Sequence, residues 1–259
     1  ALTGLALWAC TRSLHPDASS ISDKAVRFLL SCRQNDGGIY AQKGNAPGGG
    51  LATYNTAICM TALFSTERDD LTQTILRARD FVSKAQHFGS DAYHGGFAYD
   101  TRSGNPYANL LSAFHSAQAM HATSGTETQR VDGKRVDIDW AGTVQFIESL
   151  NTTTNAMLPA GQTPAHATVP LRSYGSMTYA GLLALIYANV SPQDVRVRSA
   201  LDWSMKHWSL DENPGMGREG LYFFYNVLAR ALDAAEVDFI TLEDGTDLNW
   251  RENLAQKLV

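Results

Sequence analysis

The chain has 259 residues, of which 44% are hydrophobic and only 18% are charged, so a largely disordered protein is excluded. Its 21 Lys and Arg residues against 26 Asp and Glu residues give a net charge of -5 without a basic block, so nucleic acid is not expected as a partner. The longest nearly apolar run, residues 179–190, is too short to span a bilayer, which excludes a transmembrane helix but leaves peripheral membrane contact open.

The chain reads as helices that come in pairs, after an opening apolar helix over residues 1–10. The first helix of each pair carries a large apolar anchor, and the anchors are Phe28, Phe81, Phe146, Trp203 and Leu254. A loop rich in Gly, Pro or Asn follows the anchor helix, and a second, more apolar helix comes after the loop. The second helices are predicted over NTAICMTAL, LLSAFHSAQAM, SMTYAGLLALIYA and YFFYNVLARAL.

The two helices of a pair differ in their pattern. The first helices are amphipathic, and the earliest one sets Ala25, Phe28, Leu29 and Cys32 against Lys24, Arg27 and Arg33. The second helices carry almost no charge, which is typical of a helix buried on most of its circumference. The pattern therefore predicts an outer layer of first helices and an inner layer of second helices.

Strand signals are scarce in this sequence. The Asp-Gly pairs in VDGKRVDI and LEDGTDLN each predict a short hairpin just before an outer helix. Asp139 and Asn249 then stand at N-cap positions, and Glu252 completes the spacing of a capping box after Asn249.

A single helical pair cannot bury its apolar face alone, so such pairs must stack and either curve openly or close into a ring. The sequence predicts one all-α domain over residues 1–259, with repeat units at about 20–70, 71–125, 137–192 and 195–236 and partial units at both ends. Cys10, Cys32 and Cys59 form neither a CxxC pair nor an even set, so neither a disulfide framework nor a cysteine zinc site is expected.

These repeats resemble the squalene cyclase and protein prenyltransferase beta-subunit superfamily over nearly the whole chain. KAVRFLLSCRQNDGGIY is similar to that superfamily's repeat of a basic, a small and an aromatic residue followed by Gln and a Gly-Gly-aromatic tail, with Gln34 one place late. RARDFVSKAQ with GGF keeps Gln86 in register, whereas the last two units lose both features. SYGSMTYAGLLALIYA and ENPGMGREGLYFFY resemble a bacterial subgroup of the superfamily. The resemblance implies an α/α toroid of alternating outer and inner helices.

The chemistry that the resemblance implies is not complete in this chain. Cyclases of the superfamily use the acids of a DxDDTA phrase, and the alignment places Ala52, Tyr54 and Asn55 where those acids would stand. Protein prenyltransferases use a zinc ion held by Asp, Cys and His, and Phe224 stands at the position of their His. No metal or other cofactor is therefore expected.

Polar and aromatic residues remain at the N-terminal ends of the second helices, around the mouth of the expected cavity. Asp100 and Glu219 are the candidate catalytic acids, because a carboxyl group can protonate an alkene or act in acid–base chemistry. An aromatic lining suits an isoprenoid or a carbocation. The candidate ligand-binding residues are Tyr54, Asn55, Tyr99, Arg102, Tyr107, Arg172, Tyr174, Arg218 and Tyr222.

Each candidate also has a structural interpretation. Asp100 in YDTRSGNP has the pattern of a turn-forming Asx residue, and His115 on an apolar helix has that of a hydrogen-bonded core residue. Arg218 and Glu219 can pair or cap the helix that follows them. GMGREG satisfies the GxGxxG pattern without a preceding strand, so it is interpreted as a loop.

The leading functional hypothesis is a cyclase-like protein that binds a long apolar, isoprenoid-like ligand in a central cavity. If the protein is an enzyme, the expected class is a squalene-cyclase-like isomerase or lyase. One alternative is a non-catalytic scaffold that binds a protein or a glycan. A further alternative is a glycan-active enzyme with Asp100 and Glu219 across the mouth. The sequence assigns neither an oligomeric state nor a compartment.

Overall fold

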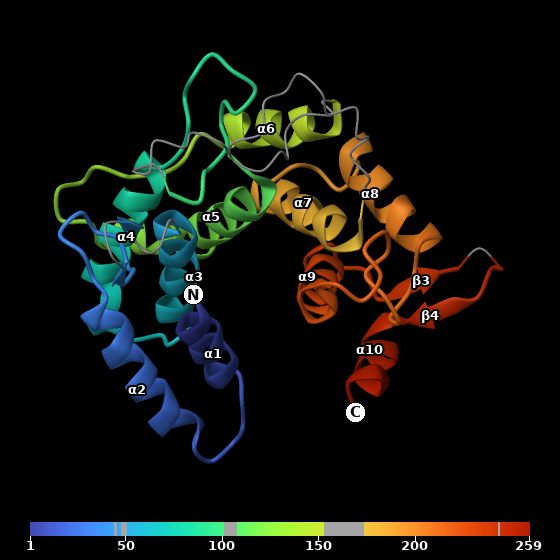
Figure 1. Cartoon of the computed structure of the whole chain (residues 1–259), viewed down its shortest axis with the longest axis horizontal. Helices are drawn as coiled ribbons and strands as arrows, with labels where there is room; N and C mark the ends of the chain where they lie inside the picture. Colours follow the sequence, from blue (N-terminus) through green and yellow to red (C-terminus); the bar gives the residue numbers. More distant parts are fainter. Residues whose placement is uncertain (44–45, 48–50, 101–107, 153–173, 243) are drawn as a thin grey trace. The chain divides into compact units, whose positions relative to one another are not determined.

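The computed structural model describes residues 1–43, 46–47, 51–100, 108–152, 174–242 and 244–259. The described residues are mostly helical, and their strands are confined to two short antiparallel pairs. They form two compact units, Ala1–Thr163 and Pro164–Val259 (Figure 1). The predicted predominance of helices is confirmed.

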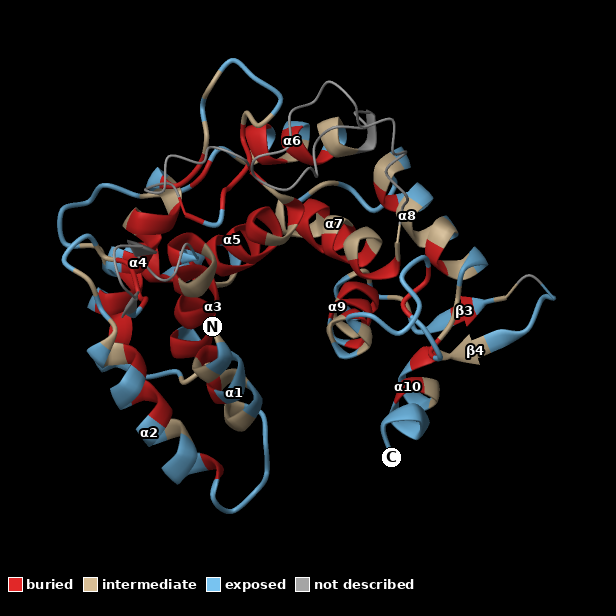
Figure 2. Ribbon diagram, viewed as in Figure 1, coloured by how far each residue is buried: buried red, intermediate tan, exposed pale blue. Residues whose placement is uncertain are grey.

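The first unit contains the opening helix and five of the helices predicted to form pairs. Its elements are α1 (Leu2–Thr11), α2 (Ala18–Ser31), β1 (Gln42–Lys43), β2 (Ala46–Pro47), α3 (Ala52–Phe64), η1 (Asp69–Leu71), α4 (Thr72–Lys84), α5 (Leu110–Ala122), η2 (Ser124–Gln129) and α6 (Trp140–Thr152). Helix α3 packs against α1, α4 and α5, and α5 also packs against α4, α6 and η2. Because several elements cover them, α3 and α5 are buried on most of their circumference (Figure 2). These are the second helices of the first two predicted repeats.

Two glycines allow each Gly-Gly loop of the first unit to touch the next first helix. Gly37 has a φ of +93°, and a Cβ atom there would lie 2.4 Å from the carbonyl oxygen of Arg77 in α4. Gly95 has a φ of +80°, and its Cβ would lie 2.0 Å from the carbonyl oxygen of Gly142 in α6. Only glycine meets both demands, left-handed backbone and close approach, so the two loops stack on α4 and α6 in the same way.

The aromatic anchors of α4 and α6 pack over the second glycine of each pair. The rings of Phe81 and Phe146 are both buried and lie close to Gly38 and Gly96. The prediction that Phe28 lies on the buried face of α2 is wrong, since Phe28 is 52% exposed. The two described Gly-Gly loops pack on α4 and α6, so neither covers this ring.

The second unit holds a helical core and a β-hairpin. Its elements are α7 (Gly175–Tyr187), α8 (Val195–Lys206), α9 (Leu221–Ala234), β3 (Phe239–Thr241), β4 (Asp247–Asn249) and α10 (Trp250–Leu258). Helix α7 packs against α8 and α9. Strands β3 and β4 pair with Ile240 opposite Leu248, which confirms the hairpin predicted in front of α10. Asn249 caps α10 as predicted, because its side chain accepts hydrogen bonds from the amides of Arg251 and Glu252.

The other predicted hairpin is wrong. Residues 131–138 contain a turn and no strand. The backbone of Val136 is bonded to side chains instead of to a partner strand, since its amide donates to Glu127 Oε2 (3.0 Å) and its carbonyl accepts from Arg79 Nη2 (2.8 Å). The N-cap predicted after this segment is confirmed, because Asp139 Oδ1 accepts from the amide of Gly142 at 3.0 Å.

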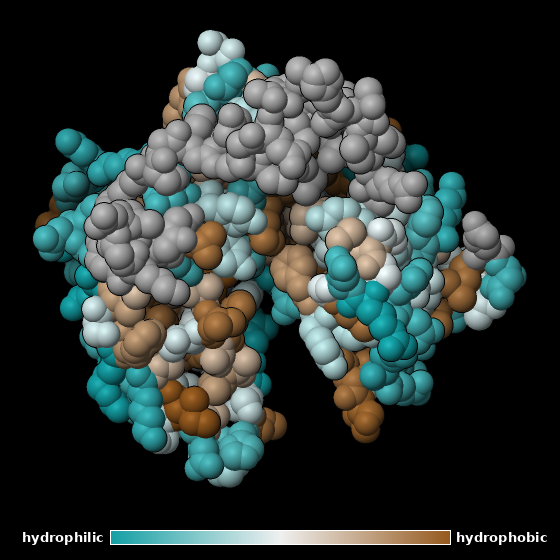
Figure 3. Space-filling view, in the orientation of Figure 1, coloured by the Kyte–Doolittle hydropathy of each residue, from teal (hydrophilic) through white to brown (hydrophobic). Residues whose placement is uncertain are grey.

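The surfaces of the two units are mixed in polarity. Among the described residues, no helix combines the length and the apolarity that crossing a bilayer requires. Apolar residues reach the surface in places, shown in brown in Figure 3. Leu2 and Leu5 in α1 and Phe28 in α2 are exposed in the first unit, and Phe239 in β3 is exposed in the second.

Candidate functional site

The loop that ends in Asp100 meets the first turn of α3. The amide of Thr53 donates a hydrogen bond to the carbonyl oxygen of Tyr99 at 2.9 Å. The N-cap residue Leu51 offers no side-chain bond, so this carbonyl satisfies one of the helix amides that lack an intrahelical partner. Tyr99 and Asp100 therefore lie beside the N-terminal end of α3, within the first unit.

Three rings form an aromatic cluster at this end of α3: Tyr54, Tyr99 and His115. The ring of Tyr54 packs edge-on against Tyr99, with centroids 5.8 Å apart, and against His115 of α5, with centroids 5.1 Å apart. His115 is buried and also packs against Phe114. Tyr54 is half-buried and Tyr99 is 36% exposed, so the aromatic cluster has one buried side and one open side.

The two phenols of the aromatic cluster stay protonated at neutral pH. Burial raises the pKa of Tyr54, and the neighbouring Tyr99 raises it further. Burial also raises the pKa of Tyr99. Each hydroxyl can therefore donate a hydrogen bond to a ligand as well as accept one.

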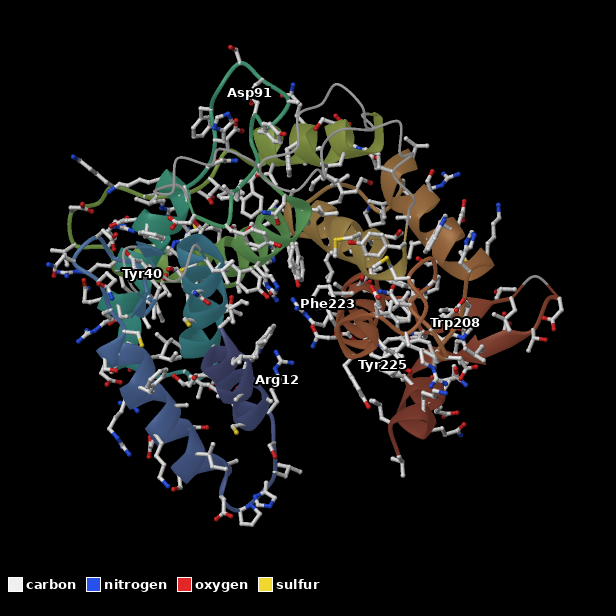
Figure 4. All side chains as sticks on the ribbon, viewed as in Figure 1. Arg12, Tyr40, Asp91, Trp208, Phe223 and Tyr225 are labelled. Atoms are coloured by element: carbon white, nitrogen blue, oxygen red, sulfur yellow. The ribbon has the colours of Figure 1, made fainter. Side chains whose placement is uncertain are left out.

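Asp100 is an interior carboxyl group next to this cluster in the sequence. Its side chain is only 2% exposed. Burial raises the pKa of Tyr40, and the nearby Asp100 raises it further, so Asp100 lies within electrostatic range of that phenol. Tyr40, labelled in Figure 4, packs against Phe81 of α4 and donates a hydrogen bond to Asp36 Oδ2 at 2.9 Å. A buried acid close to half-buried aromatic rings is an arrangement that can carry proton-transfer chemistry.

Buried hydroxyls on α3 and α5 add polar atoms to the same pair of helices. Thr53, Ser112 and Ser116 are fully buried, and their hydroxyl oxygens have no hydrogen-bond partner in the described part of the chain. Their role cannot be read from the sequence, because small hydroxyl residues on an apolar helix give no separate signal. Asn55, one residue after Tyr54, accepts a hydrogen bond on Oδ1 from the backbone nitrogen of Ala1 at 3.0 Å.

In the second unit, the side chain of Asn213 links the start of α7 to the loop that carries Glu219. Asn213 Oδ1 accepts from the amide of Ser176 at 2.9 Å, and Asn213 Nδ2 donates to the carbonyl oxygen of Glu219 at 3.1 Å. The side chain of Glu219 is exposed, as is that of Arg218. Tyr222 is 79% exposed and packs edge-on against Tyr225. Tyr174 stands half-buried at the N-cap position of α7.

The predicted site residues thus fall into three groups. Tyr54, Asn55, Tyr99 and Asp100 come together at the N-terminal end of α3. The group in the second unit comprises Tyr174, Arg218, Glu219 and Tyr222. Arg102, Tyr107 and Arg172 lie outside the described residues. The pairing of Asp100 with Glu219 stays a prediction, because each belongs to a separately described unit.

His115 is the member of the aromatic cluster that was predicted from the sequence only as a core residue. Its burial agrees with that interpretation, but its contact with Tyr54 depends on the packing of α3 against α5.

In the described ranges, no group of three or more His, Cys, Asp or Glu side chains could hold a metal ion. Comparison of the chain with protein-family models finds no match, and comparison with curated proteins finds none either.

Proposed function

We propose that this protein binds an extended apolar ligand of isoprenoid type, in a cavity enclosed by helical pairs that close into an α/α toroid. The observation that carries the proposal is the aromatic cluster of Tyr54, Tyr99 and His115 with the buried Asp100 beside it. Ligand pockets are mostly apolar with a few polar groups that fix the orientation of the ligand. The rings supply apolar contact area, and the two phenols supply the polar groups.

We further propose that Asp100 is the acid if the bound ligand reacts. In that step the protonated carboxyl group transfers its proton to an alkene carbon, a C–H bond forms as the C=C π bond opens, and a carbocation remains. The electron-rich faces of aromatic rings favour such a cation. Loss of a proton from the neighbouring carbon to the Asp100 carboxylate closes the cycle and restores the acid, which is the chemistry of an isomerase.

A non-catalytic scaffold is the second candidate, and exposed aromatic side chains favour it. Phe28 and Tyr222 are both largely exposed, which is the kind of surface feature that a protein or glycan partner covers. The two candidates differ in where an aromatic substitution matters, since the scaffold depends on these exposed rings and the ligand-binding protein on the cluster at α3.

Native mass spectrometry with squalene and with a prenyl diphosphate tests the ligand-binding proposal. We expect a one-to-one complex with the unaltered chain, a loss of affinity of about tenfold in Tyr54→Ala, and retained binding in Tyr54→Phe, which keeps the ring. Phe88→Ala is the matched control, because Phe88 is an exposed aromatic residue of the same unit outside the cluster. Absence of a complex with both lipids, together with an unchanged melting temperature, would reject the proposal.

The role of Asp100 has a separate test. In Asp100→Asn the amide cannot supply the proton, so we expect lipid binding to persist and product formation to stop. Product is measured by gas chromatography with mass detection after incubation with squalene, because an isomer has the same mass as the substrate and must be separated from it. Unaltered turnover in Asp100→Asn would remove the acid from the mechanism and leave the binding proposal intact.

A further inference from the structure

A cavity of the first unit lies between the C-terminal end of α2 and α4. It has a volume of about 520 Å³. Its walls carry two arginines, three side-chain amides and one apolar side chain, from Arg33, Arg77, Gln34, Asn35, Gln73 and Leu30. We call it the Arg33/Arg77 groove. It shares no lining residue with the aromatic cluster at α3.

The guanidinium of Arg33 is held in place by neutral groups. Its Nε donates to the carbonyl oxygen of Leu30 at 3.0 Å, and its Nη1 donates to Thr74 Oγ1 of α4 at 3.3 Å. These bonds fix the side chain across the wall from α2 to α4, and they leave its positive charge without a carboxylate partner among the described residues. Arg77 is exposed, and its guanidinium makes no hydrogen bond or ion pair with the described part of the chain.

The loop between the two arginines packs tightly against α4. Gly37, which also lines the groove, lies in close contact with the backbone of Arg77, as its missing Cβ allows. The acidic residue of this loop, Asp36, accepts hydrogen bonds from the amide of Gly38 and the hydroxyl of Tyr40, both at 2.9 Å. Arg33 and Arg77 thus place two positive charges on the walls of one groove, in a chain whose net charge is -5.

We propose that the Arg33/Arg77 groove binds an acidic peptide segment. A planar guanidinium binds a carboxylate through two parallel hydrogen bonds, so two arginines fit two acidic side chains. The amides of Gln34, Asn35 and Gln73 can both donate to and accept from peptide groups. The volume fits the range of pockets for organic ligands and exceeds what one inorganic anion fills. The described lining holds no aromatic ring on which a base could stack, which favours peptide over single-stranded nucleic acid.

Fluorescence anisotropy with the full chain tests this proposal. The probe is a fluorescein-labelled peptide of alternating Glu and Gly, and the reference is the same peptide with Gln in place of Glu. We expect saturable binding of the Glu peptide that weakens as salt is added, because the contact is between charges near the surface. Arg77→Gln should weaken it about tenfold. Arg27→Gln, which removes an exposed arginine of α2 outside the groove, should leave it unchanged.

Several results would overturn the assignment. The Gln peptide could bind equally well, the two arginine variants could lose affinity equally, or the Glu peptide could fail to bind. Inorganic phosphate that displaces the peptide at a far lower concentration would make the groove a small-anion site and would also overturn the proposal. Circular dichroism of Arg77→Gln confirms that the variant is folded. Tyr54→Ala should bind the peptide normally, so the outcome is separate from that of the lipid experiment.

Discussion

The two units differ in the polar groups that they bury. In the first unit the guanidinium of Arg79 is 1% exposed and pairs with Glu127 through a 2.6 Å contact from Nε to Oε1. Asp100 is buried there as well. In the described part of the second unit the buried polar side chains are neutral, and they are Ser176, Ser204 and Asn213.

Arg79 in the first unit and Asn213 in the second are hydrogen-bonded to distant segments of their own units. Arg79 Nη1 donates at 2.7 Å both to the carbonyl oxygen of Met120 and to Thr123 Oγ1, while Arg130 forms a second ion pair with Glu127. Asn213 binds both the amide and the hydroxyl of Ser176. The neutral arrangement needs no counter-charge, whereas the ionic one depends on every partner being present.

This difference predicts which unit loses stability when a side chain changes its protonation or its charge. Burying a charge is costly, and the cost is offset only while the opposite charge and its hydrogen bonds remain. The first unit should therefore respond strongly to loss of an interior partner and to acid. The second unit carries its ion pairs at the surface, where water replaces a lost partner.

Removal of Arg79 should have the largest effect. In Arg79→Met, Glu127 keeps Arg130 but loses its second cation, and three further oxygen atoms lose the hydrogen bonds that Arg79 donates to them. We expect the free energy of unfolding to fall by about 3 kcal/mol. Urea titration gives the total, and hydrogen exchange read by mass spectrometry should place the loss of protection in α4, α5 and η2.

Arg77→Met is the matched control for this experiment. Arg77 lies on the same helix two residues earlier and is exposed without an ion pair in the described part of the chain. Its replacement should change the unfolding free energy by less than about 0.5 kcal/mol. Equal destabilisation by both variants would mean that the buried ion pair of Arg79 contributes no more to the free energy of unfolding than an exposed arginine of the same helix.

Acid should weaken the first unit through Glu127. Burial raises the pKa of Glu127, but hydrogen bonds from Arg130, the amide of Val136 and Arg79 outweigh burial and bring its pKa to about 2. The ordinary value is 4.5, so the unfolded chain binds the proton first as the pH falls. The stabilisation is therefore complete above about pH 4.5 and is lost progressively toward about pH 2.

At about pH 3 this loss should amount to about 1–2 kcal/mol relative to about pH 6. The measurement is urea unfolding at both pH values for the unaltered chain and for Glu127→Gln. The amide does not titrate, so the variant should be less stable at the higher pH and should show a smaller decrease on acidification. A decrease of the same size in both proteins would assign the acid sensitivity to other carboxyl groups.

The sequence predicted the helical pairs because the apolar pattern within one helix is local information. It also placed Tyr99 and Asp100 in the Gly-rich loop that precedes α5 in the chain, but their position beside the N-terminal end of α3 comes from a contact between distant segments. The side of α2 to which Phe28 belongs was not local information. Burial of that ring depends on a Gly-Gly loop lying against it, as one lies against Phe81.

The interior ion pair could not be predicted from the sequence either, because its partners are distant in the chain. Glu127 and Val136, which bind Arg79, lie 48 and 57 positions later in the chain. An arginine in an amphipathic helix carries no mark that separates a buried pair from a solvated side chain. The aromatic cluster shows the same limit, because Tyr54 and His115 come from α3 and α5 and meet only through the packing of those helices.

The smallest effect is expected at the surface network of the second unit. Arg251 forms ion pairs with Asp233 (2.8 Å) and Asp238 (2.9 Å), and its side chain is 43% exposed. Arg251→Met should lower the free energy of unfolding by less than about 1 kcal/mol, since each charge regains water when its partner is removed. Added salt should shrink the difference further, because it screens exposed pairs more than buried ones. Arg251→Lys, which keeps the charge, is the control in the same urea titration. A loss as large as that of Arg79→Met would show that both units depend equally on charge, and the interior of the first unit would no longer be the distinguishing feature.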